Sequence, residues 1–176
     1  MLQHTRSILE RSIANKADAF ILDLYGDVGT FALAAADLCA SGVTIENFEE
    51  STEYAEKNLE RHGFFHMKAV CLDAASLKKL ELDKKAEGRQ LFVILDPPRS
   101  GMHPKTIAEL IRLNPALMVY ISCTLEQLAR ELVHFKNYTL ESATVFDLFP
   151  QTPHVETVVV MRRKQAREIA FSPQLL

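Results

Sequence analysis

Short apolar runs alternate along the chain with segments in which apolar residues recur every three or four positions. The first pattern predicts β-strands and the second predicts amphipathic helices. Strands are expected at Phe20–Leu24, Gly42–Glu46, His66–Cys71, Leu91–Leu95, Leu117–Ser122, Tyr138–Phe146 and Val155–Arg162. Helices are expected at Ser7–Ala14, Phe31–Ala40, Ser51–His62, Pro104–Leu113 and Leu125–Phe135. Regular alternation of this kind is typical of βαβ units and a parallel sheet.

Two segments depart from the alternation. No helical pattern separates the last two strands, which predicts an antiparallel pair at one edge of the sheet. The charged, glycine-containing segment Lys78–Gln90 reads as a solvated helix end followed by a loop. The expected fold class is therefore α/β and Rossmann-like, with a mostly parallel seven-stranded sheet and helices on both faces.

Composition narrows the class of protein further. With 176 residues, 48% of them hydrophobic, residues 1–176 are expected to form a single domain. The absence of a long apolar run or a signal-peptide pattern favours a cytoplasmic protein. Three cysteines, Cys39, Cys71 and Cys123, argue against a disulfide framework and a zinc site. The net charge of −3 means that any nucleic-acid partner must bind a local patch or another domain.

A nucleoside-containing cofactor is indicated after the first two strands. The first strand leads into Asp23-Leu-Tyr-Gly-Asp-Val-Gly-Thr30, and the second ends at Glu46, where a carboxylate can accept hydrogen bonds from ribose hydroxyls. The phosphate-binding spacing G-x-G-x-x-G is absent, which favours S-adenosylmethionine over NAD. Asp73, after the third strand, suits either the adenine amino group or the N-cap of a helix starting at Ala74.

Two further segments carry candidate chemistry. In Asp96-Pro-Pro-Arg-Ser-Gly101, the prolines hold the aspartate in a rigid turn at the strand end, whether for substrate contact or as a simple strand exit. Cys123 lies between a strand and a helix N-terminus, where the helix dipole favours a thiolate, so it is a candidate nucleophile. The alternative is a small buried hydrophobic residue, which is the interpretation kept for Cys39 and Cys71.

Three segments together resemble the RNA uracil-5-methyltransferase family. They are Asp96-Pro-Pro-Arg-Ser-Gly101, Ser122-Cys-Thr-Leu-Glu-Gln-Leu-Ala-Arg-Glu131 and Asp147-Leu-Phe-Pro-Gln-Thr-Pro-His-Val-Glu156. The resemblance covers nearly the whole chain, as the catalytic domain of that family. It implies a class I S-adenosylmethionine-dependent methyltransferase fold that forms 5-methyluridine in structured loops of transfer or ribosomal RNA.

The resemblance also assigns roles to residues. It implies a nucleophile at Cys123, a general base at Glu156 and a substrate-contacting carboxylate at Asp96. Cofactor contacts are implied at Tyr25, Thr30, Glu46 and again Asp96. The chemistry asks for such a set, because a thiolate added to C6 of uracil makes C5 nucleophilic and a base must then remove the C5 proton. Burial is expected to raise the pKa of Glu156. His154 is either an active-site donor or a structural histidine.

The chain departs from the family pattern at two places. Gly26 and Asp27 stand where the family has a cysteine and a glycine, and the Asp27 charge is expected to repel the carboxylate of the cofactor. Thr124 and Leu125 replace an asparagine and a proline, although Thr124 is expected still to cap the following helix. The RNA-binding domains that normally precede the catalytic domain are not represented, which predicts weak RNA affinity for this chain alone.

Two rival functions remain at this stage. An RNA cytosine-5 methyltransferase uses the same thiol addition, but commonly carries Pro-Cys in the fourth-strand loop, where this chain has Pro98 and Arg99. A catalytically weak module that binds RNA or protein would account for Asp27.

Overall fold

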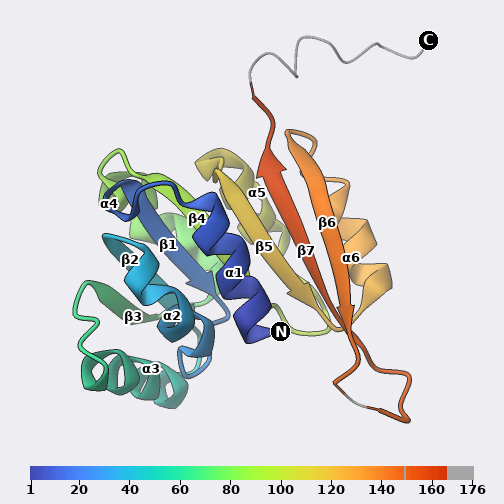
Figure 1. Ribbon diagram of the computed structural model, residues 1–176, viewed down its shortest axis with the longest axis horizontal. Helices are drawn as coiled ribbons and strands as arrows, with labels where there is room; N and C mark the ends of the chain where they lie inside the picture. Colours follow the sequence, from blue (N-terminus) through green and yellow to red (C-terminus); the bar gives the residue numbers. More distant parts are fainter. Residues whose placement is uncertain (149, 166–176) are drawn as a thin grey trace.

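A seven-stranded sheet forms the centre of the molecule (Figure 1). The computed structural model describes residues 1–148 and 150–165. The strands are β1 (Ala19–Leu24), β2 (Ser41–Glu46), β3 (Met67–Cys71), β4 (Gln90–Leu95), β5 (Leu117–Ser122), β6 (Tyr138–Phe146) and β7 (Glu156–Arg163). Their order is β3-β2-β1-β4-β5-β7-β6. The seven predicted strands and the mostly parallel sheet are confirmed.

Strand direction separates the sheet into two parts. The first five strands are parallel, whereas β7 pairs antiparallel with both β5 and β6. This confirms the antiparallel pair expected at one edge. In β1 and β5 every residue is buried, which explains why they read as continuous apolar runs rather than as alternating ones.

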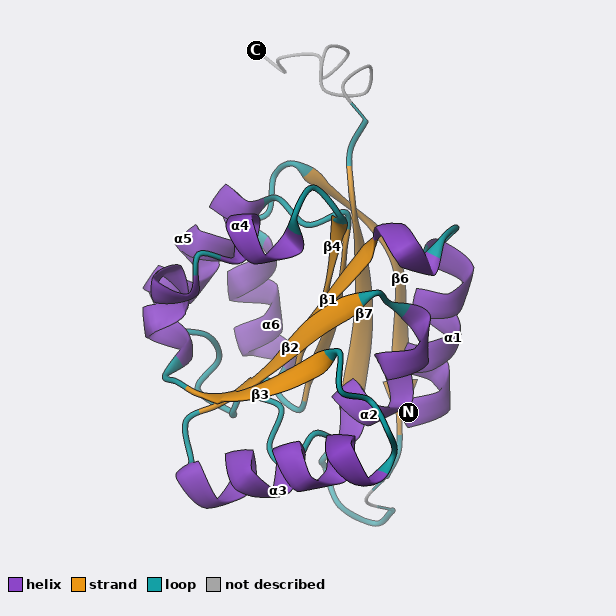
Figure 2. Cartoon of the chain, turned by 90° about the vertical axis from the view of Figure 1, so that its left-hand side faces the viewer, coloured by secondary structure: helices purple, strands orange, loops and turns teal. Residues whose placement is uncertain are grey.

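Helices cover both faces of the sheet (Figure 2). They are α1 (Leu2–Ser12), α2 (Thr30–Ala35), α3 (Glu49–Arg61), α4 (Leu82–Ala86), α5 (Pro104–Leu113) and α6 (Leu125–Leu132), with 3-10 turns at Lys16–Asp18, Ala36–Leu38 and Ala74–Leu80. One hydrophobic core joins the sheet to α1, α2 and α3, and a second joins it to α4, α5 and α6. Alternate residues of each central strand point into one core or the other.

Several expected boundaries are wrong. The first helix begins at Leu2 rather than Ser7, because Arg6 binds Asp37 and the Ala34 carbonyl and so draws the first turns against α2. The second helix ends at Ala35, where a 3-10 turn replaces its predicted last residues.

The charged segment Lys78–Gln90 was expected to be a helix end and loop, and this is wrong. It contains the end of a 3-10 helix and the whole of α4. Leu82 and Ala86 are buried in the second core together with Leu77, while the lysines around them face outward. Two buried residues four positions apart, Leu82 and Ala86, are enough to pack this short helix, which is otherwise polar.

The strand order reverses between β1 and β4, which is the usual place for a ligand crevice in a parallel α/β sheet. The loops after β1, β2, β3, β4 and β5 all start at the same end of the sheet, where the carboxyl ends of the parallel strands lie. No helix in the described ranges 1–148 and 150–165 is long and apolar enough to cross a membrane.

Candidate active site

The loop between β1 and α2 is built on a buried carboxylate. Asp23 is completely buried, and its Oδ2 accepts hydrogen bonds from the Ala32 amide and the Thr44 hydroxyl, both at 3.1 Å. Its Oδ1 has no hydrogen-bond partner within the described part of the chain. Burial, with the charges of Asp96 and Glu46, raises the pKa of Asp23 to about 7. The base of the loop therefore holds a carboxyl group that is partly protonated near neutral pH.

The backbone of this loop is sharply bent. Tyr25, Asp27 and Gly29 all have positive φ angles, of 63°, 45° and 83°. Gly26 has no room for a side chain, since a Cβ there would lie 1.9 Å from the Thr44 hydroxyl. The cysteine that the family resemblance implies at this position would therefore clash with Thr44. Thr30 begins α2 and is exposed at the crevice edge.

Glu46 ties the end of β2 to the same loop. One carboxylate oxygen accepts hydrogen bonds from the Asn47 and Phe48 amides, at 2.7 and 3.1 Å, and the other accepts the Asp27 amide at 3.2 Å. A carboxylate offers about four lone-pair positions, so one remains on this half-buried side chain. Glu46 is therefore both a structural link and a free acceptor facing the crevice.

Asp73 caps the 3-10 helix after β3. Its Oδ1 accepts the Ala75 amide at 2.8 Å, so the capping alternative is observed. The residue is exposed, and its second carboxylate oxygen is left for another partner. The adenine-contact alternative is compatible with this geometry and stays a prediction.

Asp96 leaves β4 beside the β1 loop. Its amide donates to the Leu24 carbonyl at 3.3 Å, which fixes the start of the Asp96–Gly101 turn against the end of β1. Burial, followed by the charge of Glu156, raises the pKa of Asp96 to about 6. The charge of Glu156 thus acts on Asp96, which indicates that the two carboxylates lie in the same region of the molecule.

The far end of this turn is held by a buried glutamate of α6. Glu131 accepts hydrogen bonds from the Met102 amide at 2.8 Å, the Gln127 side chain at 2.7 Å and the Tyr120 hydroxyl at 2.6 Å. Gly101 has φ of 78°, and a Cβ there would lie 1.9 Å from the Glu131 carboxylate. Glu131 thus joins the turn after β4 to α6 and β5, the elements on either side of Cys123.

The ladder between β5 and β7 brings Cys123 near Glu156. Ser122, the last residue of β5, pairs with Thr157 of β7 in an antiparallel register. Cys123 follows Ser122 and Glu156 precedes Thr157, so both residues lie at the same end of this ladder, one position beyond its last pair, although Cys123 itself is outside β5. Burial raises the pKa of Glu156, as expected from the sequence, while the charge of Arg99 lowers it.

A cavity of about 360 Å³ opens beside Cys123. It is lined by Arg99, Cys123, Thr124, Leu125, Glu126, Pro153, His154 and Val155. The turn after β4, the start of α6 and the segment before β7 all contribute to it. A thiol, a cation and an imidazole therefore face one volume whose size suits a small-molecule or nucleobase site.

Thr124 does not cap α6 as the sequence predicted. It occupies the N-cap position, but its side chain makes no capping hydrogen bond. Its hydroxyl instead lies 3.7 Å from the Cys123 sulfur. The reason is local, because the Ser122 hydroxyl binds both the amide and the carbonyl of Thr124 and sets its backbone.

The remaining cysteines differ from each other. Cys39 is buried in the first core, which confirms its packing role, but Cys71 is exposed at the end of β3. Within residues 1–148 and 150–165, no three metal-binding side chains converge.

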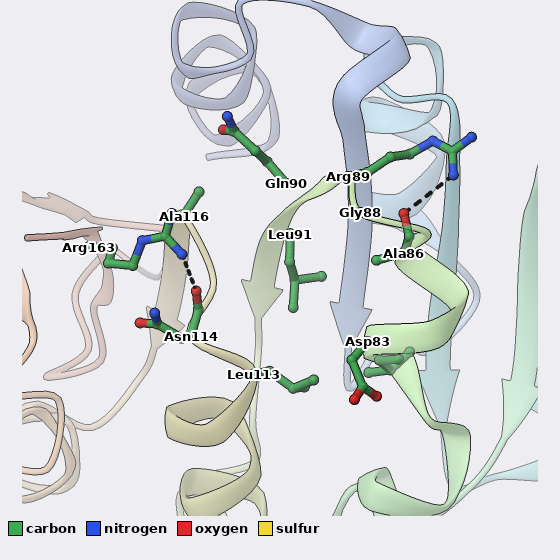
Figure 3. Close-up of a pocket in the computed structure, with 11 residues that line it drawn as sticks. Asp83, Ala86, Gly88, Arg89, Gln90, Leu91, Leu113, Asn114, Ala116 and Arg163 are labelled. Carbon is green, nitrogen blue, oxygen red and sulfur yellow. Dashed lines mark hydrogen bonds between the residues drawn. The ribbon is translucent and has the colours of Figure 1, made fainter. Parts of the chain in front are cut away.

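Sequence reasoning missed the supports of the site rather than its reactive groups. The structural roles of Asp23 and Glu131 went unrecognised, although a charged residue within an apolar strand or on the apolar side of a helix is the signal that marks such positions. Another cavity, of about 340 Å³, lies at the opposite end of the parallel strands, between the start of β4, the end of α5 and Arg163 (Figure 3). It contains none of the predicted site residues.

Comparison with known proteins follows the same lines as the geometry. The family model described as tRNA (Uracil-5-)-methyltransferase matches residues 6–164. An uncharacterized RNA methyltransferase of Nitratidesulfovibrio vulgaris is 38% identical over 159 residues, or 89% of this chain and 34% of that protein. The tRNA (uracil(54)-C(5))-methyltransferase of Saccharomyces cerevisiae is 33% identical over 82% of this chain and 23% of its own length.

A solved structure is similar over the same region. The tRNA (uracil-54, C5)-methyltransferase of Pyrococcus abyssi, in complex with S-adenosyl-L-homocysteine, superposes with a TM-score of 0.71 and 29% identity, over 90% of this chain and 37% of that one. The Rossmann-like class I methyltransferase fold is thereby confirmed. The chain spans about a third of the length of most of the curated relatives that it matches.

Proposed function

Because this chain belongs to the tRNA (uracil-5-)-methyltransferase family, we propose that it transfers a methyl group from S-adenosylmethionine to C5 of a uridine in transfer or ribosomal RNA. The observation that supports the proposal is the register between β5 and β7, which brings Cys123 and Glu156 to the same end of one ladder, with Cys123 lining a cavity of about 360 Å³. The yeast and archaeal relatives act on tRNA uracil, and a Marinomonas relative acts on 23S rRNA uracil.

The crevice above β1 and β2 fits a nucleoside cofactor. Glu46 keeps a free acceptor position for ribose hydroxyls, and the bent loop from Tyr25 to Thr30 is tied to it through the Asp27 amide. Tyr25 is half-buried beside this crevice, and burial raises the pKa of its hydroxyl, so the ring stays neutral. Asp73 is the proposed partner of the adenine. When bound, S-adenosylmethionine supplies the methyl group as an electrophile.

Cys123 is the proposed nucleophile. Its thiolate adds to C6 of the flipped uracil, and the electron pair of the C5–C6 bond moves into the ring as an enolate. C5 then takes the methyl group. Glu156 accepts the C5 proton, after which the C6–sulfur bond breaks and the thiolate is released. The position of Glu156 at the same end of the β5–β7 ladder as Cys123 supports this proposed role as the base.

Asp96 is the proposed contact between the two halves of the site. Asp96 lies beside the end of β1, where the cofactor is proposed to bind. The charge of Glu156, near which the uracil is proposed to bind, also acts on Asp96. With its pKa raised to about 6, it is partly protonated near neutral pH and can donate as well as accept a hydrogen bond. A uracil ring, which carries both carbonyl oxygens and an N–H, is suited to such a group.

Covalent trapping tests the nucleophile. The chain is incubated at high concentration with S-adenosylmethionine and an RNA loop containing 5-fluorouridine, whose C5 fluorine cannot leave as a proton does. The wild type should form an adduct that survives a denaturing gel, and Cys123→Ala should form none. Cys71→Ala is the matched control, because that cysteine is exposed but lies outside the cavity. Equal trapping in Cys123→Ala would overturn the assignment.

Glu156→Gln tests the base. This variant should complete methyl transfer to ordinary RNA and then remain bound to it, since the C5 proton stays in place. Normal turnover by Glu156→Gln would remove the proposed role. The alternative of a binding module without catalysis, suggested by Asp27, predicts no heat of binding with S-adenosylmethionine in calorimetry. A cytosine substrate would instead yield adducts with 5-fluorocytidine RNA.

A further inference from the structure

We infer that Thr124 is a further catalytic residue, whose hydroxyl donates a hydrogen bond to the Cys123 thiolate. The inference rests on the proposed function for the identity of the nucleophile. It concerns a position where this chain departs from its family, which has asparagine after the cysteine. A hydroxyl and a sulfur that lie 3.7 Å apart are within range of such a bond, since sulfur is a large acceptor.

The orientation of Thr124 follows from its neighbours. The Ser122 hydroxyl accepts the Thr124 amide at 3.2 Å and donates to the Thr124 carbonyl at 3.1 Å. The same carbonyl accepts the Leu128 amide at 3.0 Å, which is the first hydrogen bond of α6. With its backbone held on both sides, the threonine turns its side chain toward the sulfur and away from the helix amides.

Thr124 and Cys123 also share an environment open to substrate. Both line the cavity of about 360 Å³, and both are half-buried. The charged and titratable groups around this sulfur come from every element packed there: Arg99 from the turn after β4, Glu126 from α6, His154 from the segment before β7, and Glu156 from β7. Among the groups around the sulfur, the Thr124 hydroxyl is the one for which a direct contact with it is observed.

A capping role is the competing interpretation, and it predicts different behaviour. Threonine at an N-cap stabilises a helix when its oxygen accepts an amide. Here that bond is absent, so removing the hydroxyl should leave the melting temperature nearly unchanged. If the hydroxyl serves the sulfur, its removal should instead slow every reaction of the Cys123 thiolate.

Alkylation by iodoacetamide, followed from pH 6 to pH 10 by mass spectrometry of individual cysteine peptides, tests the inference without RNA or cofactor. Thr124→Val keeps the shape and removes the donor. It should slow alkylation of Cys123 about tenfold at pH 7 and move the midpoint of its rate–pH curve upward by about one pH unit. Thr124→Ser should restore the wild-type curve. Cys71, exposed in the same molecule, is the internal reference and should not change.

Each outcome has a single meaning. If Thr124→Val alkylates Cys123 at the wild-type rate across the range, the inference is overturned. A lower melting temperature with an unchanged curve also overturns it and assigns capping. If the curve shifts as expected but 5-fluorouridine RNA is not captured by the wild type, the proposed function fails while the hydrogen bond stands.

Discussion

Replacing Asp23 by asparagine isolates the energetic cost of the carboxyl group beneath the cofactor loop. The side chain is fully buried, and its pKa is raised from an ordinary value of 3.8 to about 7, mainly by burial. A folded-state pKa above the unfolded one means that the folded protein binds the proton more tightly. The stability that Asp23 contributes is therefore complete below about pH 4 and is lost as the pH rises through 7.

The size of the effect follows from the two pKa values. Each pKa unit corresponds to 1.36 kcal/mol, so a rise from 3.8 to about 7 represents roughly 4 kcal/mol in all. Between pH 5 and pH 8 about 2–3 kcal/mol of this should appear. Asparagine resembles the protonated acid, because its oxygen can accept from Ala32 and Thr44 while its amide takes the place of the unpartnered oxygen.

Urea unfolding measures the difference directly. The chain has no tryptophan, so unfolding is followed by circular dichroism at pH 5, 6, 7 and 8. The free energy of unfolding of Asp23→Asn, relative to wild type, should rise by about 2–3 kcal/mol from pH 5 to pH 8. Asp18→Asn, at an exposed aspartate before β1, removes the same charge and serves as the control. A wild-type-to-variant difference that is constant across this range would refute the reasoning.

Three further substitutions test the supports of the site. Glu131→Ala should lower the free energy of unfolding in urea by about 3 kcal/mol, because it leaves the Tyr120 hydroxyl and the Met102 amide buried without their acceptor. Glu126→Ala, at an exposed position on the same helix, should change the free energy of unfolding by less than about 0.5 kcal/mol. Gly101→Ala should lower the free energy of unfolding in urea more than Gly88→Ala does, since both glycines have φ near 80° but only a Cβ at Gly101 would meet Glu131. Equal losses of unfolding free energy would show that the turn adjusts easily. Asp27→Gly should bind S-adenosylmethionine about three- to tenfold more tightly in calorimetry, because it removes both a strained φ of 45° and a negative charge. Asp27→Asn should recover only the part of this gain that is due to the charge. Unchanged affinity in both variants would place Asp27 away from the cofactor.

The strands could be predicted from the sequence because they leave local signals, and local signals also made Cys123 and Glu156 the candidate reactive residues. Fully buried strands such as β5 appear as continuous apolar runs, and Cys123 and Glu156 lie in segments of distinctive composition. Their proximity depends on the register between β5 and β7, which joins residues that are 33 positions apart and has no local signal. Glu131 illustrates the same limit, because its three partners come from a turn, a strand and its own helix.

Short polar elements escaped prediction for a different reason. In α4, five residues carry only two buried side chains, so the hydrophobic period is too brief to distinguish a helix from a loop. Thr124 shows that even a correct position does not determine a role. The residue occupies the expected N-cap, but a neighbouring serine hydroxyl redirects its side chain.

The β-bulge on the outermost strand has a consequence for how the domain tolerates change. Between Leu140 and Ser142, β6 gains one residue relative to β7, and Glu141 at that point pairs with Arg162. An insertion or deletion in β6 can be accommodated at this bulge before it changes the register of β7, the inner strand of the hairpin. The register of β7 against β5, which brings Glu156 near Cys123, is thus protected from changes in the length of the outermost strand. The sequence of β6 can therefore vary while the candidate catalytic residues keep their positions.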